Sequence, residues 1–295
     1  MFNVVTPTYN RKHTLERVYN SLLSQTFKDF VWIIVDDCST DNSDKLINNW
    51  IKQSKMRIEY YKLPTNQGKP KAVNFGLEQC TRPYTIIVDS DDSFVSNTFE
   101  DLKNLWSTIE TNHTNVAAIW TLVLDDDGNI KGDTFPEDQW QVDFETRVLK
   151  RKKQIDGDKW HSWKTDILKQ YPLYSQPNCH IGESHTWNAI NKKHDFLCVN
   201  IAHLTAHYSE VSLINSKKSK TRLATGYYYS SYYGLKDVPV SEIVKYKFYR
   251  NLAFEYIKSK FTFSDKKLKL STAKYMVCLV VFLVVSPLRL IKKAL

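Results

Sequence analysis

The chain has 295 residues, of which 42% are hydrophobic and 25% charged, and this composition is typical of a folded protein and excludes wholesale disorder. Its five cysteines are scattered and include no C-x-x-C pair, which excludes a disulfide scaffold or a zinc ribbon and favours a reducing compartment. The eight glycines form neither G-x-G-x-x-G nor a P-loop, so we expect no nicotinamide or P-loop nucleotide site. The chain opens directly on a strand-like run, Phe2 to Val5, from which we expect no signal peptide.

The net charge of +9 is unevenly distributed along the chain. Residues 212–295 carry 17 Lys and Arg against 4 Asp and Glu, a net +13, whereas residues 1–211 carry 24 against 28, a net −4. A strongly basic segment can bind anionic lipid or nucleic acid. Because no nucleic-acid recognition motif accompanies it, we expect no nucleic-acid partner.

Strand and helix signals alternate over the first 125 residues. Apolar runs predict buried strands, and apolar residues at helical spacing predict helices between them. The expected strands are residues 4–5, 30–35, 58–61, 84–88 and 116–124, and the expected helices are 15–23, 46–51, 70–79 and 99–109. Four or five such units in succession predict an α/β fold with a mostly parallel sheet and helices on both faces.

Polar segments follow three of the predicted strands. They are Thr6–Asn10, Asp36–Thr40 and Asp89–Asp92. In parallel sheets ligands bind beyond the carboxyl ends of the strands, so we expect these segments to meet at one edge of the sheet.

The third segment is the most acidic. Asp89, Asp91 and Asp92 place three carboxylates within four residues, and their repulsion is costly unless a cation binds. Hard oxygen ligands suit Mg²⁺ or Mn²⁺. The alternative is an Asp-rich turn in which Asp92 or Ser93 caps the next helix. A second acidic pair at a neighbouring strand end, Asp36–Asp37, favours the metal.

Several motifs together resemble family 2 glycosyltransferases of the GT-A fold. Their order along the chain also matches that family, continuously over residues 1–95 and more weakly over 96–210. The motifs are Val5–Arg11, Ser24–Thr26, Ile34–Asp41, Asn66–Lys69 with Ala72, Asn74 and Gly76, and Val88–Asp92, which matches the D-x-D region.

The resemblance implies a role for each matching residue. Thr6, Pro7 and Tyr9 would line the nucleotide pocket, and Asp37 or Asp36 would hydrogen-bond the base. Asp89 would approach the ribose, with Ser90 beside it on the nucleotide, while Asp91 and Asp92 would complete the metal site with Asp89. Lys69 or Lys71 would lie near the nucleotide, although surface lysines that only face solvent are the alternative.

An inverting transfer also needs a carboxylate that takes the proton of the acceptor hydroxyl. Ile181–Asn188 resembles the short Gly-acidic motif that precedes a helix in these enzymes, which makes Glu183 the candidate base. The alternative is a purely structural acidic residue at a helix start.

Histidine and tryptophan side chains add weaker signals. His203 or His207 could supply a further metal ligand, His207 being our prediction, and a structural histidine is the alternative for each. His161, His180 and His185 could contact the acceptor, but nothing in their spacing raises them above surface residues. Trp160, Trp163 and Trp187 could stack on sugars or belong to the core.

The basic C-terminal segment mixes charge with apolar runs. Residues 239–261 predict one helix, and residues 275–285 are a strictly apolar run of 11, broken by Ser286–Pro287. A bilayer-spanning helix needs about 20 apolar residues. The alternatives are a buried helix, a span, and a segment lying in the membrane interface; the last agrees best with the lysines and tyrosines.

Together these features predict a GT-A domain over residues 1–211 and a membrane-associated tail over 212–295. The resemblance implies an inverting, Mn²⁺- or Mg²⁺-dependent hexosyl- or N-acetylhexosaminyltransferase that uses a UDP-sugar. Its acceptor would be a glycan or lipid-linked hydroxyl, in bacterial surface polysaccharide synthesis at the cytoplasmic face of the membrane. A non-catalytic scaffold, or a sugar nucleotidyltransferase, is the alternative, and the oligomeric state stays open.

Overall fold

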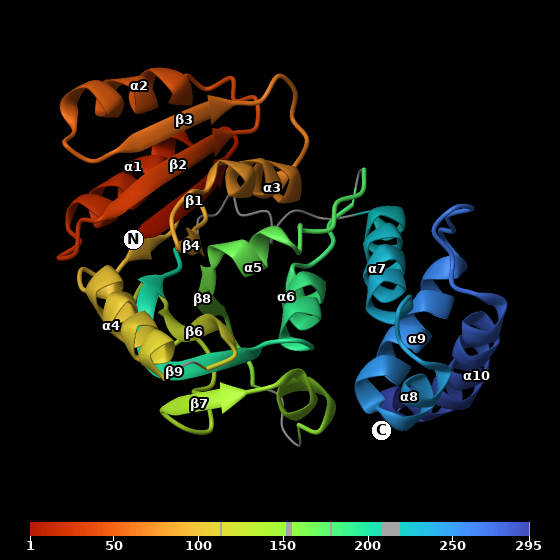
Figure 1. Cartoon of the computed structure of the whole chain (residues 1–295). Helices are drawn as coiled ribbons and strands as arrows, with labels where there is room; N and C mark the ends of the chain where they lie inside the picture. The colour runs from red at the N-terminus through yellow and green to blue at the C-terminus, as the bar shows by residue number, and fades with distance from the viewer. Residues whose placement is uncertain (113, 152–154, 178, 208–218, 295) are drawn as a thin grey trace. The chain divides into compact units, whose positions relative to one another are not determined.

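The structure is a computed structural model that describes residues 1–112, 114–151, 155–177, 179–207 and 219–294. The chain divides into two compact units (Figure 1). The sheet unit comprises Met1–Asp143, Lys153–Leu173 and Ala189–Glu210, and the helical unit comprises Phe144–Lys152, Tyr174–Asn188 and Val211–Leu295.

This division differs from the predicted one at two segments. Residues 144–152 and 174–188 group with the C-terminal helices, because Phe144 and Ile181 belong to the apolar core of the helical unit. The predicted boundary after residue 211 lies outside the described residues. The candidate base Glu183 therefore belongs to the helical unit.

The sheet has the strand order β3-β2-β1-β4-β8-β6-β9-β5, with β7 paired to β9, in the part of the chain that the structure describes. The strands are β1 Phe2–Thr8, β2 Phe30–Asp36, β3 Ile58–Lys62, β4 Tyr84–Ile87, β5 Ser93–Phe94, β6 Val116–Leu124, β7 Gln139–Val142, β8 Lys159–Lys164 and β9 Asp195–Thr205. The helices of this unit are α1 Lys12–Leu23, α2 Ser43–Gln53, α3 Lys69–Gln79, α4 Thr98–Thr111 and α5 Thr165–Lys169, and α6 Ser184–Asn191 spans the division between the units.

The predicted α/β fold class is confirmed, and the sheet is mixed. Strands β3, β2, β1 and β4 are parallel, whereas β8 is antiparallel to both β4 and β6, and β5 and β7 are antiparallel to β9. The parallel half corresponds to the βα units predicted from the sequence. Between β6 and β8 the described residues contain β7 and one helical turn, at Glu145–Leu149, and antiparallel neighbours such as β6 and β8 need no crossover helix.

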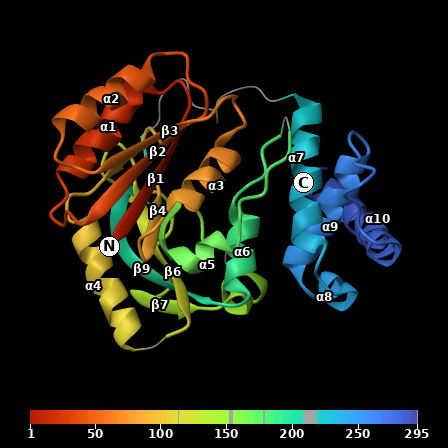
Figure 2. The same cartoon turned by 45° about the horizontal axis from the view of Figure 1, so that its top comes forward.

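Successive side chains of β1 point to opposite faces of the sheet. Phe2 and Val4 pack into a core with Leu15 and Val18 of α1 and with residues of α2 and α4. On the other face, α3 approaches so closely that a Cβ added at Gly76 would lie 2.6 Å from Cγ1 of Val5. Helices therefore cover both faces of the sheet, with α3 opposite α1 and α2 (Figure 2).

The helical unit contains α7 Lys220–Leu235, α8 Val240–Lys245, α9 Lys247–Lys260 and α10 Thr272–Ala294, with a single π-helical turn, η1, at Glu145–Leu149 (Figure 1). The predicted single helix over 239–261 is therefore wrong, because the chain is extended at Tyr246. Arg250 Nη1 donates to the carbonyls of Val244 (2.5 Å) and Lys245 (2.8 Å), so it satisfies acceptors freed by the break. The Tyr246 hydroxyl donates to Glu145 at 3.1 Å, which stabilises the extended residue.

Helix α10 contains the apolar run 275–285 and continues through Ser286 and Pro287, so these two residues end the apolar run without ending the helix. The Ser286 hydroxyl donates to the Phe282 carbonyl at 2.7 Å inside the helix. Among the described residues, no helix combines the length and the apolar character needed to cross a bilayer.

Candidate active site

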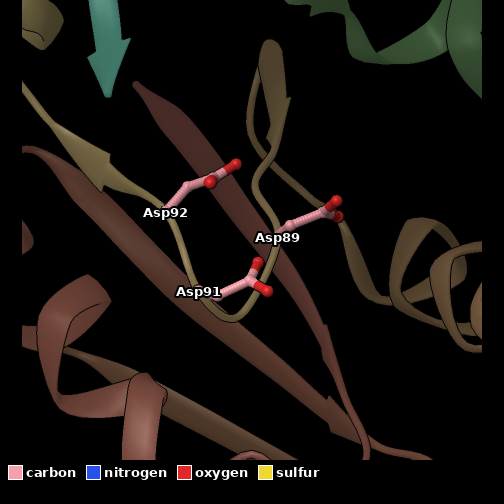
Figure 3. Close-up of side chains that lie close together, drawn as sticks. All are labelled: Asp89, Asp91 and Asp92. Carbon is pink, nitrogen blue, oxygen red and sulfur yellow. The ribbon is translucent and has the colours of Figure 1, made fainter. Parts of the chain in front are cut away.

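Three carboxylates lie together on the loop between β4 and β5 (Figure 3). Asp89, Asp91 and Asp92 each offer an oxygen, and these atoms lie within 4.8 Å of one another. The backbone N–H of Asp92 donates to the Asp89 carbonyl at 3.3 Å, which closes the turn and keeps the side chains together. The alternative that this turn caps the next helix is wrong: β5 intervenes, and α4 begins only at Thr98.

The electrostatics of this loop favour a cation. Burial, followed by the charge of Asp89, raises the pKa of Asp91. Burial, then Asp89 and Asp91, raise the pKa of Asp92 to about 8, although the backbone N–H of His207 and the charge of Lys69 oppose the shift. A divalent ion would remove the repulsion, and an all-oxygen donor set fits Mg²⁺ or Mn²⁺.

Lys69 lies at the start of α3 and contacts the same cluster. Its Nζ lies 2.7 Å from Oδ1 and 3.0 Å from Oδ2 of Asp89. Lys71 instead donates to Gln67 at 3.4 Å. Of the two predicted lysines, the structure brings only Lys69 to the carboxylates. Both lysines are exposed, so the solvated-lysine alternative stays open for each.

Two arginines beside the cluster were not predicted as site residues. Arg17 Nη1 donates to the Asp91 carbonyl at 2.7 Å, which ties the loop to α1, and the charge of Arg11 opposes the rise in the pKa of Asp91. Arg11 stands in a motif quoted above, whereas Arg17 has no sequence signal beyond its place on the polar side of α1.

The three residues expected at the end of β1 differ in accessibility. Thr6 is fully buried and its hydroxyl accepts a 2.9 Å hydrogen bond from Trp32 Nε1, and Pro7 is buried as well. Tyr9 is 45% exposed. The Thr6 side chain is therefore a structural group, which corrects the prediction that it lines a pocket, and Tyr9 is the accessible residue of the three.

Asp36 and Asp37 both accept internal hydrogen bonds. Asp36 is fully buried, and its oxygens accept from the Ser39 N–H (2.7 Å) and the Tyr60 hydroxyl (2.8 Å). Asp36 thus connects β2 to β3, which corrects its assignment to the nucleotide.

Asp37 stays a candidate for the base. It accepts from the N–H groups of Gln67 (2.8 Å) and Gly68 (2.7 Å) and so orders the loop before α3. Each carboxylate oxygen has a second lone pair that could accept from a base.

The loops after β1 and β2 are joined to each other. The N–H of Asn10 donates to Ser39 Oγ at 2.9 Å, and Asn10 Oδ1 accepts from the N–H of Thr40 at 2.8 Å. Asn10 (φ 53°) and Cys38 (φ 70°) both adopt left-handed backbone conformations. The predicted convergence of the strand ends is thus built from paired, strained loops.

His207 lies next to the acidic loop but outside the group of three carboxylates. Its backbone N–H donates to Asp92 at 3.4 Å, its Nε2 lies 2.8 Å from Ser93 Oγ, and its Nδ1 contacts Asp126. The role of His207 as a metal ligand therefore stays a proposal.

His203 is structural. It is buried with Nε2 3.3 Å from Asp101 Oδ2, and burial lowers its pKa although Asp101 opposes the shift.

Glu183 precedes α6 in the helical unit. Its carbonyl accepts from the N–H groups of Thr186 (2.9 Å) and Trp187 (3.2 Å), so it begins the first helical turn, and its side chain is half-buried. The helix dipole favours an acidic side chain at this position whether or not it acts as a base, so the structural alternative stays open.

The tryptophan candidates of both units are buried in the structure. Trp160, Trp163 and Trp187 are all buried, which confirms the core alternative over sugar stacking. His161 and His185 are buried too, so their description as surface residues is wrong, whereas His180 is exposed. His161 Nδ1 accepts from Trp163 Nε1 at 2.8 Å, and His185 Nε2 lies 2.5 Å from Ser230 Oγ.

Curated relatives resemble the N-terminal part of the chain. The poly(ribitol-phosphate) beta-N-acetylglucosaminyltransferase TarS of Staphylococcus aureus (strain Mu50) is 34% identical over 121 residues, 40% of this chain and 20% of that protein. The putative teichuronic acid biosynthesis glycosyltransferase TuaG of Bacillus subtilis (strain 168) is 34% identical over 100 residues, 34% of this chain and 39% of that protein. The chain thus matches well under half the length of these relatives.

Solved structures resemble nearly the whole chain. S. aureus TarS 1-349 in complex with UDP-GlcNAc has a TM-score of 0.64 at 20% identity, covering 95% of this chain and 79% of that one. A mannosyltransferase from Pyrobaculum calidifontis, in complex with GDP-Man and Mn²⁺, has a TM-score of 0.56 at 16% identity, covering 88% of this chain and 73% of that one. At these identities the likeness shows the fold, which is the GT-A fold that the motifs imply.

The family model described as glycosyl transferase family 2 matches residues 3–166, more than half of the chain. That range contains every motif of the strand ends and the acidic loop, and it ends before Glu183. The chain belongs to glycosyltransferase family 2.

Proposed function

We propose that this chain transfers a sugar from a nucleotide-diphospho-sugar, preferably a UDP-sugar, to an acceptor hydroxyl with inversion at the anomeric carbon. The observation that carries the proposal is the group of three carboxylates at the strand ends, with the raised pKa values of Asp91 and Asp92. The complex of TarS with UDP-GlcNAc supports a UDP-sugar, and hence an N-acetylhexosamine or hexose, although the GDP-Man complex of the mannosyltransferase keeps a second nucleotide open.

The donor end of the proposed reaction lies on the sheet unit. Asp89, Asp91 and Asp92 would hold Mn²⁺ or Mg²⁺, with His207 as a further ligand, and Asp37, Tyr9 and Ser90 would contact the nucleoside. A divalent ion at this place neutralises charge that develops on the departing diphosphate. Lys69, now paired with Asp89, would be free to approach a phosphate once the ion balances the carboxylates.

The acceptor end of the proposed reaction rests on Glu183. Its carboxylate would take the proton of the acceptor hydroxyl as that oxygen bonds to the anomeric carbon, while the bond from this carbon to the diphosphate oxygen breaks. At the start of α6 the N–H groups of the first helical turn make the setting favourable for an acidic side chain.

The class of acceptor is proposed from the relatives. TarS and TuaG are named for poly(ribitol-phosphate) and teichuronic acid, so a glycan or a lipid-linked glycan of a bacterial surface polysaccharide is the proposed acceptor of this chain.

The first test is thermal unfolding with UDP, GDP and dTDP, each with and without Mn²⁺. Ligand that binds only the folded state raises the melting temperature by mass action. We expect UDP to stabilise the protein only with Mn²⁺, and UDP-GlcNAc to be consumed when an acceptor glycan is added. Absence of any nucleotide effect would contradict the proposed donor site and favour a non-catalytic scaffold.

We also propose that α10 attaches the protein to an anionic membrane surface, such as the cytoplasmic face. Its exposed apolar side chains share one face, because the last three follow the first by four, seven and eight residues: Met276 (52% exposed), Val280 (57%), Leu283 (63%) and Val284 (62%). Exposed Lys266, Lys267 and Lys269 precede the helix. An apolar helix face beside lysines is typical of helices that lie in the interface, and the net +13 of residues 212–295 disfavours a second copy as the occupant.

Sedimentation with lipid vesicles tests this attachment. Wild type should pellet with vesicles containing phosphatidylglycerol and not with pure phosphatidylcholine, and Leu283→Asp should stay in solution. Ile130→Asp is the matched control, since Ile130 is exposed on the sheet unit. Binding that does not depend on Leu283, or a stable dimer by light scattering that Leu283→Asp dissociates, would overturn the proposal.

A further inference from the structure

Helix α7 carries a line of small residues on one face. Gly226, Ser230 and Gly234 are spaced four residues apart, so they lie above one another along the helix. This face contacts segment 174–188, which belongs to the same unit and contains Glu183.

The contact is closer than larger side chains would allow. A Cβ added at Gly226 would lie 2.7 Å from the carbonyl oxygen of His180, which is a backbone atom and cannot rotate away. A Cβ added at Gly234 would lie 3.2 Å from Cε1 of His185 and 2.6 Å from Cδ1 of Leu252. Glycine is therefore required at position 226 for α7 to approach the segment this closely, whereas a Cβ at position 234 would meet only side-chain atoms, which can shift.

Between the two glycines, Ser230 makes a polar contact with the same segment. Its Oγ lies 2.5 Å from Nε2 of His185, and the His185 side chain is buried while Ser230 is half-buried, so this hydrogen bond is partly shielded from water. His185 is only two residues after Glu183, within the first turn of α6.

Further contacts fix the segment on the other side of Glu183. The rings of Tyr174 and Tyr233 stack with centroids 4.0 Å apart, and Gln176 Nε2 donates to the Tyr233 hydroxyl at 2.8 Å. The segment is thus attached to α7 at residues 174, 176, 180 and 185, before and after the candidate base.

We infer that α7 is a positioning element for Glu183, with Ser230 acting through His185 and Gly226 setting the distance between helix and segment. This inference rests on the proposed role of Glu183 as the base. A displacement of about 1 Å in a reacting group can cost about 100-fold in rate. The C-terminal helices therefore serve the transfer step itself, in addition to any membrane attachment.

Full-length Ser230→Ala and Gly226→Ala test the inference. We expect each to lower kcat by about 10- to 100-fold, while the KM for the donor and the Kd for UDP with Mn²⁺ stay within twofold of wild type. Thr225→Ala is the matched control, because it removes a hydroxyl from the same helix that donates only to the Thr221 carbonyl at 2.8 Å. Circular dichroism shows whether each variant is folded. If Gly226→Ala does not fold, Ser230→Ala alone tests the inference.

A double-mutant cycle with Glu183→Gln separates positioning from general destabilisation. If Ser230 acts through Glu183, Ser230→Ala lowers kcat in the wild type but causes no further loss in Glu183→Gln. An equal loss in both backgrounds, or no loss in either, would overturn the inference while Glu183 remains the base. Full activity of Glu183→Gln itself would instead refute the proposed base.

Discussion

The sheet unit and the helical unit hold their candidate residues by different means. In the sheet unit, Asp89, Asp91 and Asp92 follow directly from a strand end, and hydrogen bonds within the adjoining loops fix their place. In the helical unit, Glu183 lies on a segment whose position depends on contacts with a helix that begins 37 residues later, at Lys220.

The cores of the sheet unit and the helical unit also differ in the kinds of side chain that they bury. The sheet core is built from strand residues such as Val4 and Ile34 that alternate along β1 and β2. The helical core contains Tyr228, whose buried hydroxyl donates to the Leu268 carbonyl at 2.8 Å, and Tyr229, whose hydroxyl donates to Asp265 at 2.8 Å. Polar groups inside a core fix one particular packing, so we expect the helical unit to tolerate fewer substitutions near its candidate residue.

Asp91→Asn should give the largest effect and should act on the donor. It keeps the shape of the side chain but removes a charged ligand, and the loss of metal-assisted stabilisation of the diphosphate is expected to lower kcat/KM by about 1,000-fold or more. Mn²⁺-dependent stabilisation by UDP should vanish as well. Asp127→Asn, in an exposed turn, is the control and should behave as wild type. Retained activity in Asp91→Asn would mean that the metal site is misassigned.

Glu183→Gln should give a comparable or smaller loss that leaves donor binding intact. Removal of a general base is expected to lower kcat by about 100- to 10,000-fold, because the acceptor hydroxyl keeps its proton. Titration calorimetry of UDP with Mn²⁺ should give the wild-type Kd. If Glu183→Gln also weakened the binding of UDP, Glu183 would belong to the donor site. The assignment of the donor to the sheet unit and of the acceptor to the helical unit would then be wrong.

The sequence predicts the sheet unit better than the helical unit for a physical reason. Apolar runs and helical spacing are local signals, and they locate β1 to β4 and the helices between them. The direction of β8 depends on its partners β4 and β6, and the break at Tyr246 depends on Glu145, about 100 residues away. Such long-range pairings leave no local pattern.

Some errors at the site had a signal that could have been used. Phe2 and Val4 of β1 point into the core of the sheet unit. The same alternation places Thr6 on that face, where its hydroxyl accepts a hydrogen bond from Trp32. Asp36 is likewise the last residue of β2, on the same face as Ile34. A side chain in the loop beyond a strand end, such as Asp37 or Asp89, is better placed to meet a ligand than one that the alternation of the strand turns into the core.

The affinity of the acidic loop for Mn²⁺ should rise with pH. Asp92 has a pKa of about 8, raised by burial and by its acidic neighbours, so in the folded protein it keeps a proton that the unfolded chain loses near pH 4. Metal must displace this proton, and the apparent Kd should therefore fall by up to about tenfold per pH unit below pH 8 and level off above it.

The raised pKa of Asp92 also determines whether the stability of the folded protein rises or falls with pH. Without metal, stability should fall as the pH rises from about 4 to about 8, because the unfolded carboxylate ionises first. Calorimetry in two buffers of different ionisation enthalpy counts the proton released on Mn²⁺ binding. A pH-independent Kd with no proton release would show that Asp92 is ionised before the metal arrives.

Cys38→Gly should give the smallest effect, a gain in stability confined to the sheet unit. Cys38 adopts φ 70°, a conformation that costs an L-residue with a Cβ about 1–2 kcal/mol and costs glycine nothing. Glycine has greater freedom in the unfolded chain, which offsets part of that gain, so the expected net stabilisation is about 0.5–1 kcal/mol. Cys38→Ala, the control, keeps the Cβ and the strain and should not stabilise the protein in urea unfolding. If both variants stabilise equally, the thiol and not the backbone is the unfavourable group, and the loop that carries Asp37 is less strained than its geometry indicates.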